Sequence, residues 1–127
     1  MKMFEILELE TILPKLTTKQ LPIRTLYKLN KLIELVEREK TFYQEQFQSL
    51  VDIYAERDTA GNYVYVDETG SAVKILPDKI VECQSKMNEL INIEIESVPN
   101  IAFTFDELDS LTLSYTEARP LMNFINE

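Results

Sequence analysis

The sequence predicts an α+β fold that is mainly helical, and three observations lead to this prediction. Apolar residues recur at alternating steps of three and four from Leu26 to Tyr54, which is the period of a helix packed lengthwise against others. Neither Gly nor Pro interrupts this stretch, so one long helix can extend over about 22–57. Later stretches alternate apolar and polar residues, as short strands do. The 127 residues fit a single domain, 1–127.

Residues 1–58 are expected to form a helical hairpin. A first helix is predicted from apolar residues at steps of three and four, namely Ile6, Leu9, Leu13 and Leu16. Pro14 should kink this helix or end it near Leu13. Pro22 suits the first position of the long helix. At 1.5 Å per residue that helix would be on the order of 50 Å long, which exceeds the width of a compact domain of this size.

Residues 59–127 are expected to form an α+β subregion with an acidic surface. Two β-type runs around the turn at Gly70, which can take positive φ, predict a β-hairpin over about 63–75. Asp78 is a good N-cap for a third helix over about 79–92.

The rest of the chain is expected to add a small sheet and a last helix. The alternating stretches 93–96 and 101–105 predict two short strands of a small antiparallel sheet. Ser114 and Glu117 match a capping box, which predicts a short C-terminal helix.

The composition argues against most classes of enzyme. Histidine is absent, which removes the commonest general base and most zinc sites. Two glycines cannot build a Gly-rich phosphate loop. Cys83 is the sole cysteine, so no internal disulfide can form, and we interpret it as a small buried hydrophobe. We therefore expect no enzymatic activity, and no catalytic, cofactor-binding or metal-binding residues.

Acidic charge is concentrated in the second half of the chain. Residues 1–60 carry a net charge of −1 and residues 61–127 a net charge of −8, and no basic residue lies between Met87 and Ala118. Direct binding of nucleic acid by this half is disfavoured, because contacts to phosphate need cations. Two interpretations stay open: a solvated acidic surface, or an acidic face that occupies a basic groove on a partner.

Six residues are candidates for binding a protein partner. Five are acidic residues of the second half: Glu94, Glu96, Asp106, Glu107 and Asp109. The sixth is Lys40, the polar member of the heptad series, which can specify register or oligomer state. The alternative, which we favour, is that its stem lies along the surface and its ammonium group reaches water. The long helix then has two apolar ends joined by a charged middle at 37–41, as a packed scaffold helix does.

Several motifs together resemble a known family. They are the run Leu21-Pro22-Ile23-Arg24-Thr25-Leu26-Tyr27-Lys28-Leu29, then Phe42-Tyr43-Gln44-Glu45, Phe103-Thr104-x-Asp106-Glu107-Leu108 and Leu121-Met122-x-Phe124-Ile125. Over roughly residues 21–127 the chain is similar to a small protein family of unassigned function found in phages and prophages of Gram-positive bacteria. The resemblance implies a viral setting and brings no site residues.

Two functions are expected within that setting. The first is a non-enzymatic protein–protein interaction protein, a structural or assembly accessory that acts through its long helix. Its partner would be another copy of itself in a homo-oligomer, a phage structural protein or a host protein. The alternative is an acidic inhibitor of a host defence nuclease or of another nucleic-acid-binding protein.

The expected location is the host cytoplasm when the protein is made, with association with the virion also open. The first apolar run is broken by Glu5, Glu8 and Glu10, so neither a signal peptide nor a transmembrane helix is expected.

Overall fold

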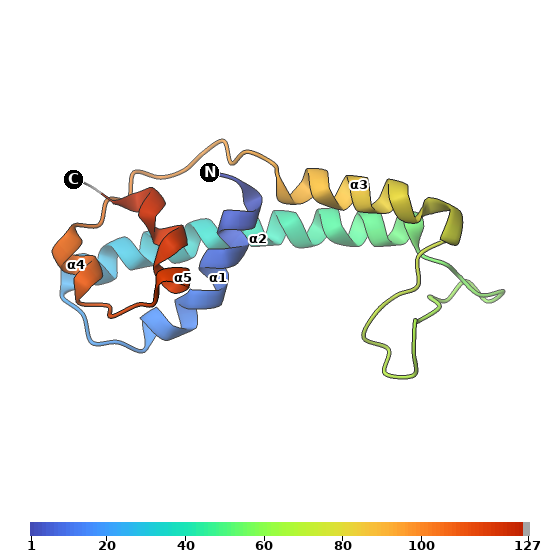
Figure 1. Ribbon diagram of the computed structural model, residues 1–127, viewed down its shortest axis with the longest axis horizontal. Helices are drawn as coiled ribbons and strands as arrows, with labels where there is room; N and C mark the ends of the chain where they lie inside the picture. Colours follow the sequence, from blue (N-terminus) through green and yellow to red (C-terminus); the bar gives the residue numbers. More distant parts are fainter. Residues whose placement is uncertain (126–127) are drawn as a thin grey trace. The chain divides into compact units, whose positions relative to one another are not determined.

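The computed structural model describes residues 1–125, and the fold is mainly helical (Figure 1). The elements in chain order are α1 (Met3–Thr17), α2 (Ile23–Tyr54), the 3₁₀ helix η1 (Pro77–Lys79), α3 (Ile80–Ile91), α4 (Phe105–Asp109), α5 (Tyr115–Ala118) and the 3₁₀ helix η2 (Arg119–Phe124). The predicted N-terminal pair of helices, the long second helix, the third helix and the short C-terminal helix are therefore confirmed.

The predicted β-structure is wrong. Within residues 1–125 the chain forms isolated β-bridges and no β-sheet. The two alternating stretches do not pair with each other, because Glu94 pairs with Lys2 and Phe103 pairs in parallel with Ile125. The predicted hairpin over about 63–75 is reduced to one bridge, Tyr65 with Val73. Its two arms also pair with the segment after α2, Tyr63 with Arg57 and Ile75 with Ala55, but each of these pairings is again a single bridge.

Three predicted helix boundaries also need correction. Pro14 does not end α1, which continues to Thr17 with Pro14 exposed at its surface. The long helix ends at Tyr54 and not near 57, since the chain then bonds to the segment that returns towards α3. Asp78 does not cap the third helix, because it lies within η1, and Lys79 occupies the N-cap position of α3.

The chain divides into two compact units. Unit 1 consists of residues 1–41 and the described residues from Ile93 onward, and unit 2 consists of residues 42–92. The long helix α2 contributes residues to both units.

Unit 1 has a continuous apolar core. The apolar stripe of α1 is buried, as are α2 side chains from its first half. Phe103, Leu121 and Phe124 complete this core from the C-terminal part of the chain, each at most 3% exposed. The Thr104 and Ser114 side chains accept hydrogen bonds from the N–H groups of Glu107 and Glu117, so each begins a short helix with a capping box.

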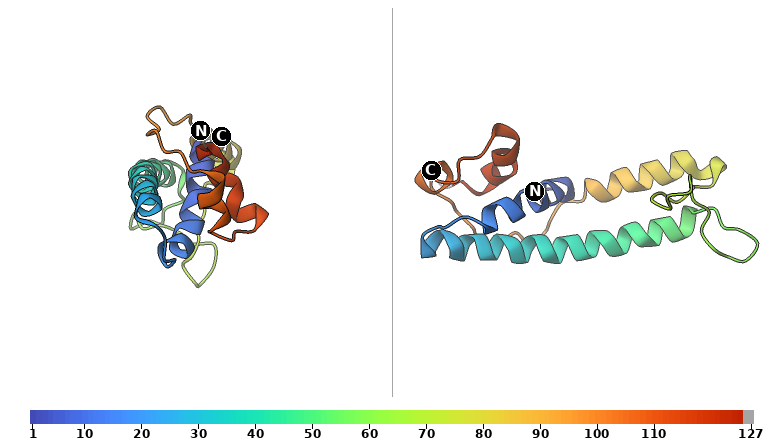
Figure 2. Two further views of the ribbon diagram at one scale, coloured as in Figure 1. Left: turned by 90° about the vertical axis from the view of Figure 1, so that its left-hand side faces the viewer. Right: turned by 90° about the horizontal axis from the view of Figure 1, so that it is seen from below.

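Unit 2 buries much less apolar surface. Its second helix, α3, runs alongside the second half of α2, and a loop of residues 55–76 connects them (Figures 1 and 2). The loop is tied to the end of α2 by backbone bonds, among them Leu76 N–H to Tyr54 O at 2.9 Å. The buried apolar residues of this unit are Val51, Tyr54, Ala55, Cys83 and Leu90.

Candidate functional site

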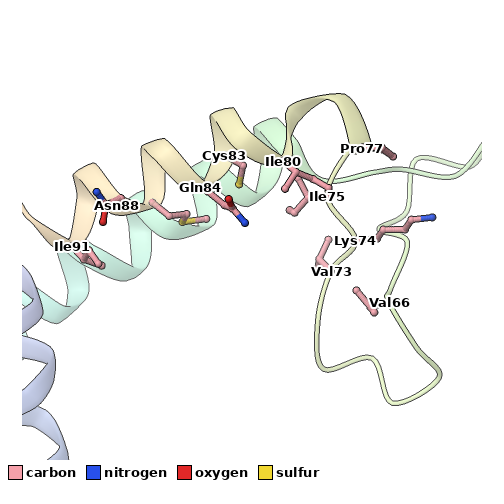
Figure 3. A pocket seen from close by; sticks show the side chains of 11 residues that line it. Val66, Val73, Lys74, Ile75, Pro77, Ile80, Cys83, Gln84, Asn88 and Ile91 are labelled. Carbon is pink, nitrogen blue, oxygen red and sulfur yellow. The ribbon is translucent and has the colours of Figure 1, made fainter.

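Unit 2 contains an apolar groove. Its volume is about 610 Å³, and it lies between α3 and the loop that precedes it (Figure 3). We call it the α3 groove and define it by its apolar lining residues: Val66, Val73, Ile75, Pro77, Ile80, Cys83, Met87 and Ile91. Pockets of this volume with mostly apolar walls are typical of binding sites in proteins.

The helix wall of the groove follows from the spacing of apolar residues along α3. Ile80, Met87 and Ile91 recur at helical steps and therefore share one stripe of the helix. Cys83 and Leu90 form the neighbouring stripe and are each 5% exposed. The helix thus has a buried apolar stripe, of which Cys83 also borders the groove, and beside it a more exposed apolar stripe that lines the groove.

The opposite wall consists of Val66 and residues 73–75 of the loop, together with Pro77 of η1. Lys74 N–H donates to Val64 O at 2.7 Å, and Ile75 pairs with Ala55. Gly70, with φ of 67°, allows the chain to reverse before this segment, as predicted. Lys74 is the charged residue among the lining residues, and its side chain points away from α3 (Figure 3). Its ammonium group lies 3.4 Å from Glu56, which leaves the groove floor apolar.

Cys83 lies on the groove side of the unit 2 core and is buried, as the sequence predicted. Burial raises the pKa of its thiol, because a thiolate is disfavoured away from water. The side chain therefore acts here as a small apolar group.

A polar cluster lies on the second half of α2. Asp52 accepts hydrogen bonds from the Tyr63 hydroxyl and from the Gln48 amide, the latter at 3.2 Å. These bonds lower the pKa of Asp52, and the bond to Asp52 raises the pKa of Tyr63. The Arg57 guanidinium lies 4.5 Å from the centre of the Tyr63 ring. The cluster holds the start of the loop against α2. Its bond between Asp52 and Tyr63 was not predicted, because the two residues are separated by the end of α2 and a turn.

The carboxylate of Glu107 is hydrogen-bonded within unit 1. Its side chain is 15% exposed and accepts hydrogen bonds from Lys28 Nζ at 2.5 Å, Thr25 Oγ1 at 2.8 Å and Thr104 N–H at 3.0 Å. Burial by itself raises the pKa of Glu107, but the bonds from Lys28, Thr104 and Thr25 outweigh it and lower the pKa to about 2.

The other acidic candidates lie in two places. Asp106 and Asp109 are exposed and share α4 with Glu107. Glu94 and Glu96 lie on the extended segment after α3, where Glu94 is bonded to the N-terminal ammonium group at 3.2 Å and Glu96 is exposed. The helix α4 thus brings three of the five acidic candidates together.

Lys40 lies on α2 in unit 1 and is paired with a residue of α1. Its ammonium group is 2.6 Å from Glu10, and each side chain is 37% exposed. This partly exposed ion pair within the chain explains why a lysine can occupy a position of the heptad series, and no partner chain is needed to explain it.

The described residues contain neither a metal-binding cluster nor a membrane span. Within residues 1–125, no three or more Cys, Asp or Glu side chains are grouped so that they could hold a metal ion. None of the helices in that range is both long and apolar enough to cross a membrane. Comparison with protein-family models, curated proteins and solved structures finds no match to this chain. The resemblance to a phage and prophage family stays a prediction.

Proposed function

We propose that this protein is a non-enzymatic protein–protein interaction protein, a phage-type assembly accessory that acts through the second half of its long helix and the α3 groove beside it. The single observation that carries the proposal is the apolar surface of unit 2, which the unit itself does not cover. A pair of helices with a loop has no further layer on which to bury a second apolar face.

Exposure of large side chains supports this proposal. On α2, Phe42, Phe47 and Ile53 are 40%, 41% and 64% exposed, and on α3 Ile80 is 43% exposed. Uncovered apolar patches on soluble proteins commonly mark interaction sites. Each Å² of apolar surface that a partner covers contributes about 25 cal/mol to the free energy of association. Burial of even part of the groove would therefore favour binding.

The test is affinity capture of the tagged full-length protein from cells that carry the phage, with quantitative mass spectrometry. Met87→Lys places a charge in the groove. Val81→Lys is the matched control, because Val81 lies on the same helix, is 81% exposed and is outside the groove. We expect a partner that the wild type and the V81K protein retain and the M87K protein loses. Circular dichroism checks that both variants remain helical. A set of captured proteins that is identical for M87K and V81K would contradict the proposal.

The alternative, an acidic inhibitor of a nucleic-acid-binding protein, is supported by the exposed carboxylates of Asp106 and Asp109 on α4. Glu107 contributes less to such a face, since its carboxylate is already bonded to Lys28 and Thr25. The same capture experiment separates the two functions. An inhibitor would lose its partner on the double change Asp106→Asn with Asp109→Asn, and its association rate would fall steeply with salt.

A further inference from the structure

We infer that the α3 groove receives the N-terminal end of α2 from a second copy of this chain, so that copies associate head to tail. This inference rests on the proposed function, because it names the partner of the same groove. It follows from two surfaces of opposite charge, each with uncovered apolar side chains, in different units of the chain.

The donor surface is the first part of α2, which we call the α2 tip and define by Ile23, Arg24, Tyr27 and Lys31. Ile23 is 81% exposed and Tyr27 is 63% exposed. They are four residues apart, so they stand side by side on one face of the helix. The Lys31 ammonium group lies 4.8 Å from the centre of the Tyr27 ring. The tip is therefore an amphipathic helical stripe with basic residues beside its apolar ones.

The charge of this region is uniformly basic. Residues 11–33 contain five Lys or Arg and neither Asp nor Glu. Two of the five are paired within unit 1, Lys15 with Glu117 and Lys28 with Glu107. The other three, Lys19, Arg24 and Lys31, make no ion pair within residues 1–125. Two of these three cations belong to the tip.

The receiving unit has the opposite charge. Unit 2 contains nine Asp or Glu and four Lys or Arg, a net charge of −5. All four of its basic side chains lie within 4.0 Å of a carboxylate: Arg57, Lys74, Lys79 and Lys86. Acidic residues outside these pairs adjoin the groove along the chain. Asp67 and Glu68 follow the lining residue Val66, and Asp78 follows Pro77. The apolar floor (Figure 3) is thus flanked by excess negative charge.

Helix-in-groove contacts are made by apolar side chains at steps of three and four along one helix face. Ile23 and Tyr27 have this spacing, and the groove presents Ile80, Met87 and Ile91 to receive them. A contact between two grooves is disfavoured, because unit 2 carries a net charge of −5 in each copy. Because tip and groove are different surfaces, a pair of copies still has one free tip and one free groove. Such a contact extends into rings or filaments.

The test measures the mass of the full-length protein by analytical ultracentrifugation over a range of concentrations. We expect the weight-average mass of the wild type to rise with concentration and to fall back when salt is added. The groove variant Met87→Lys and the tip variant Ile23→Glu with Tyr27→Glu should each remain monomeric. The control Val81→Lys should behave like the wild type.

The most discriminating measurement uses an equimolar mixture of the groove variant and the tip variant. The M87K protein supplies an intact tip, and the tip variant supplies an intact groove, so the mixture should form heterodimers and stop there. An interface made of the same surface on both copies would not be restored by mixing. Ile80→Lys is a second groove variant, to be used if M87K lowers the helical signal.

A mixture that stays monomeric would overturn the inference, as would a wild-type protein that is monomeric at its highest soluble concentration. The outcome for the proposed function is separate. If the protein is monomeric but captures another protein in a way that M87K abolishes, head-to-tail association is wrong and the proposed function stands. If M87K changes neither mass nor capture, both are wrong.

Discussion

Lys28 on α2 donates a 2.5 Å hydrogen bond to Glu107 on α4, although the two residues lie 79 positions apart in the chain. The carboxylate also accepts bonds from Thr25 and from the Thr104 N–H group, so it joins the capping box of α4 to the first half of α2. Glu107 thus organises unit 1, and its bonding partners make it the acidic residue of α4 that is least free to meet another chain.

Replacing Glu107 by Ala should destabilise the protein by about 2 kcal/mol, because the partly buried Lys28 and the buried Thr25 hydroxyl both lose their hydrogen-bond partner. Chemical denaturation measures this change. Asp109→Asn is the matched control on the same helix, and because Asp109 is exposed its effect should stay within about 0.5 kcal/mol. Equal effects of the two substitutions would show that the bond network at Glu107 contributes no more than a surface charge does.

Acid should weaken unit 1 in a way that depends on the same carboxylate. Burial raises the pKa of Glu107, but the bonds from Lys28, Thr104 and Thr25 outweigh it and lower the pKa from the ordinary value of 4.5 to about 2. A carboxyl whose pKa is lower in the folded state stabilises the fold above pH 4.5, and this contribution is lost as the pH falls from 4.5 towards 2. Free energies of unfolding measured across this interval should decrease, and the decrease should be smaller in the Glu107→Gln protein. If E107Q leaves the pH dependence of the free energy of unfolding unchanged, the acid sensitivity arises from other carboxylates.

Helices were predictable in this chain because their signals are local. The stripe from Leu26 to Tyr54 and the capping box of Ser114 and Glu117 each lie within one element, and both were predicted. Thr104 and Glu107 form the same box, but the alternation in 101–105 indicated a strand there. Both patterns are present, and only the packing of α4 near Lys28 and Thr25 decides between them.

The strands could not be predicted for the opposite reason, since strand pairing depends on distant partners. Glu94 pairs with Lys2 and Phe103 with Ile125, and nothing in either stretch indicates those partners. The groove was predictable in part. The third helix was expected, but which of its two apolar stripes is covered depends on how α3 packs in unit 2.

Tyr63 should ionise at a pH above the ordinary value of 10.0. Its hydroxyl donates to Asp52, and that bond raises the pKa of Tyr63 because the tyrosinate form cannot donate it. Asp52→Asn should lower the pKa of Tyr63, as followed by ultraviolet absorbance during alkaline titration. Tyr63→Phe identifies the affected step in the titration, and Tyr65→Phe is the control, since Tyr65 is exposed in the same loop. A titration that D52N leaves unchanged would contradict the bond.

Cys83 in the folded protein should react with thiol reagents at least about tenfold more slowly than in the urea-unfolded chain. The side chain is 5% exposed, and burial raises the pKa of its thiol, so both access and the thiolate fraction are reduced. The rate should rise with pH through a midpoint above that of a free thiol. Because Cys83 also lines the α3 groove, a partner seated there should slow the reaction further, and this effect should be absent from the Met87→Lys protein. A folded protein that reacts as fast as the unfolded chain would show that unit 2 opens readily and that its core does not protect Cys83.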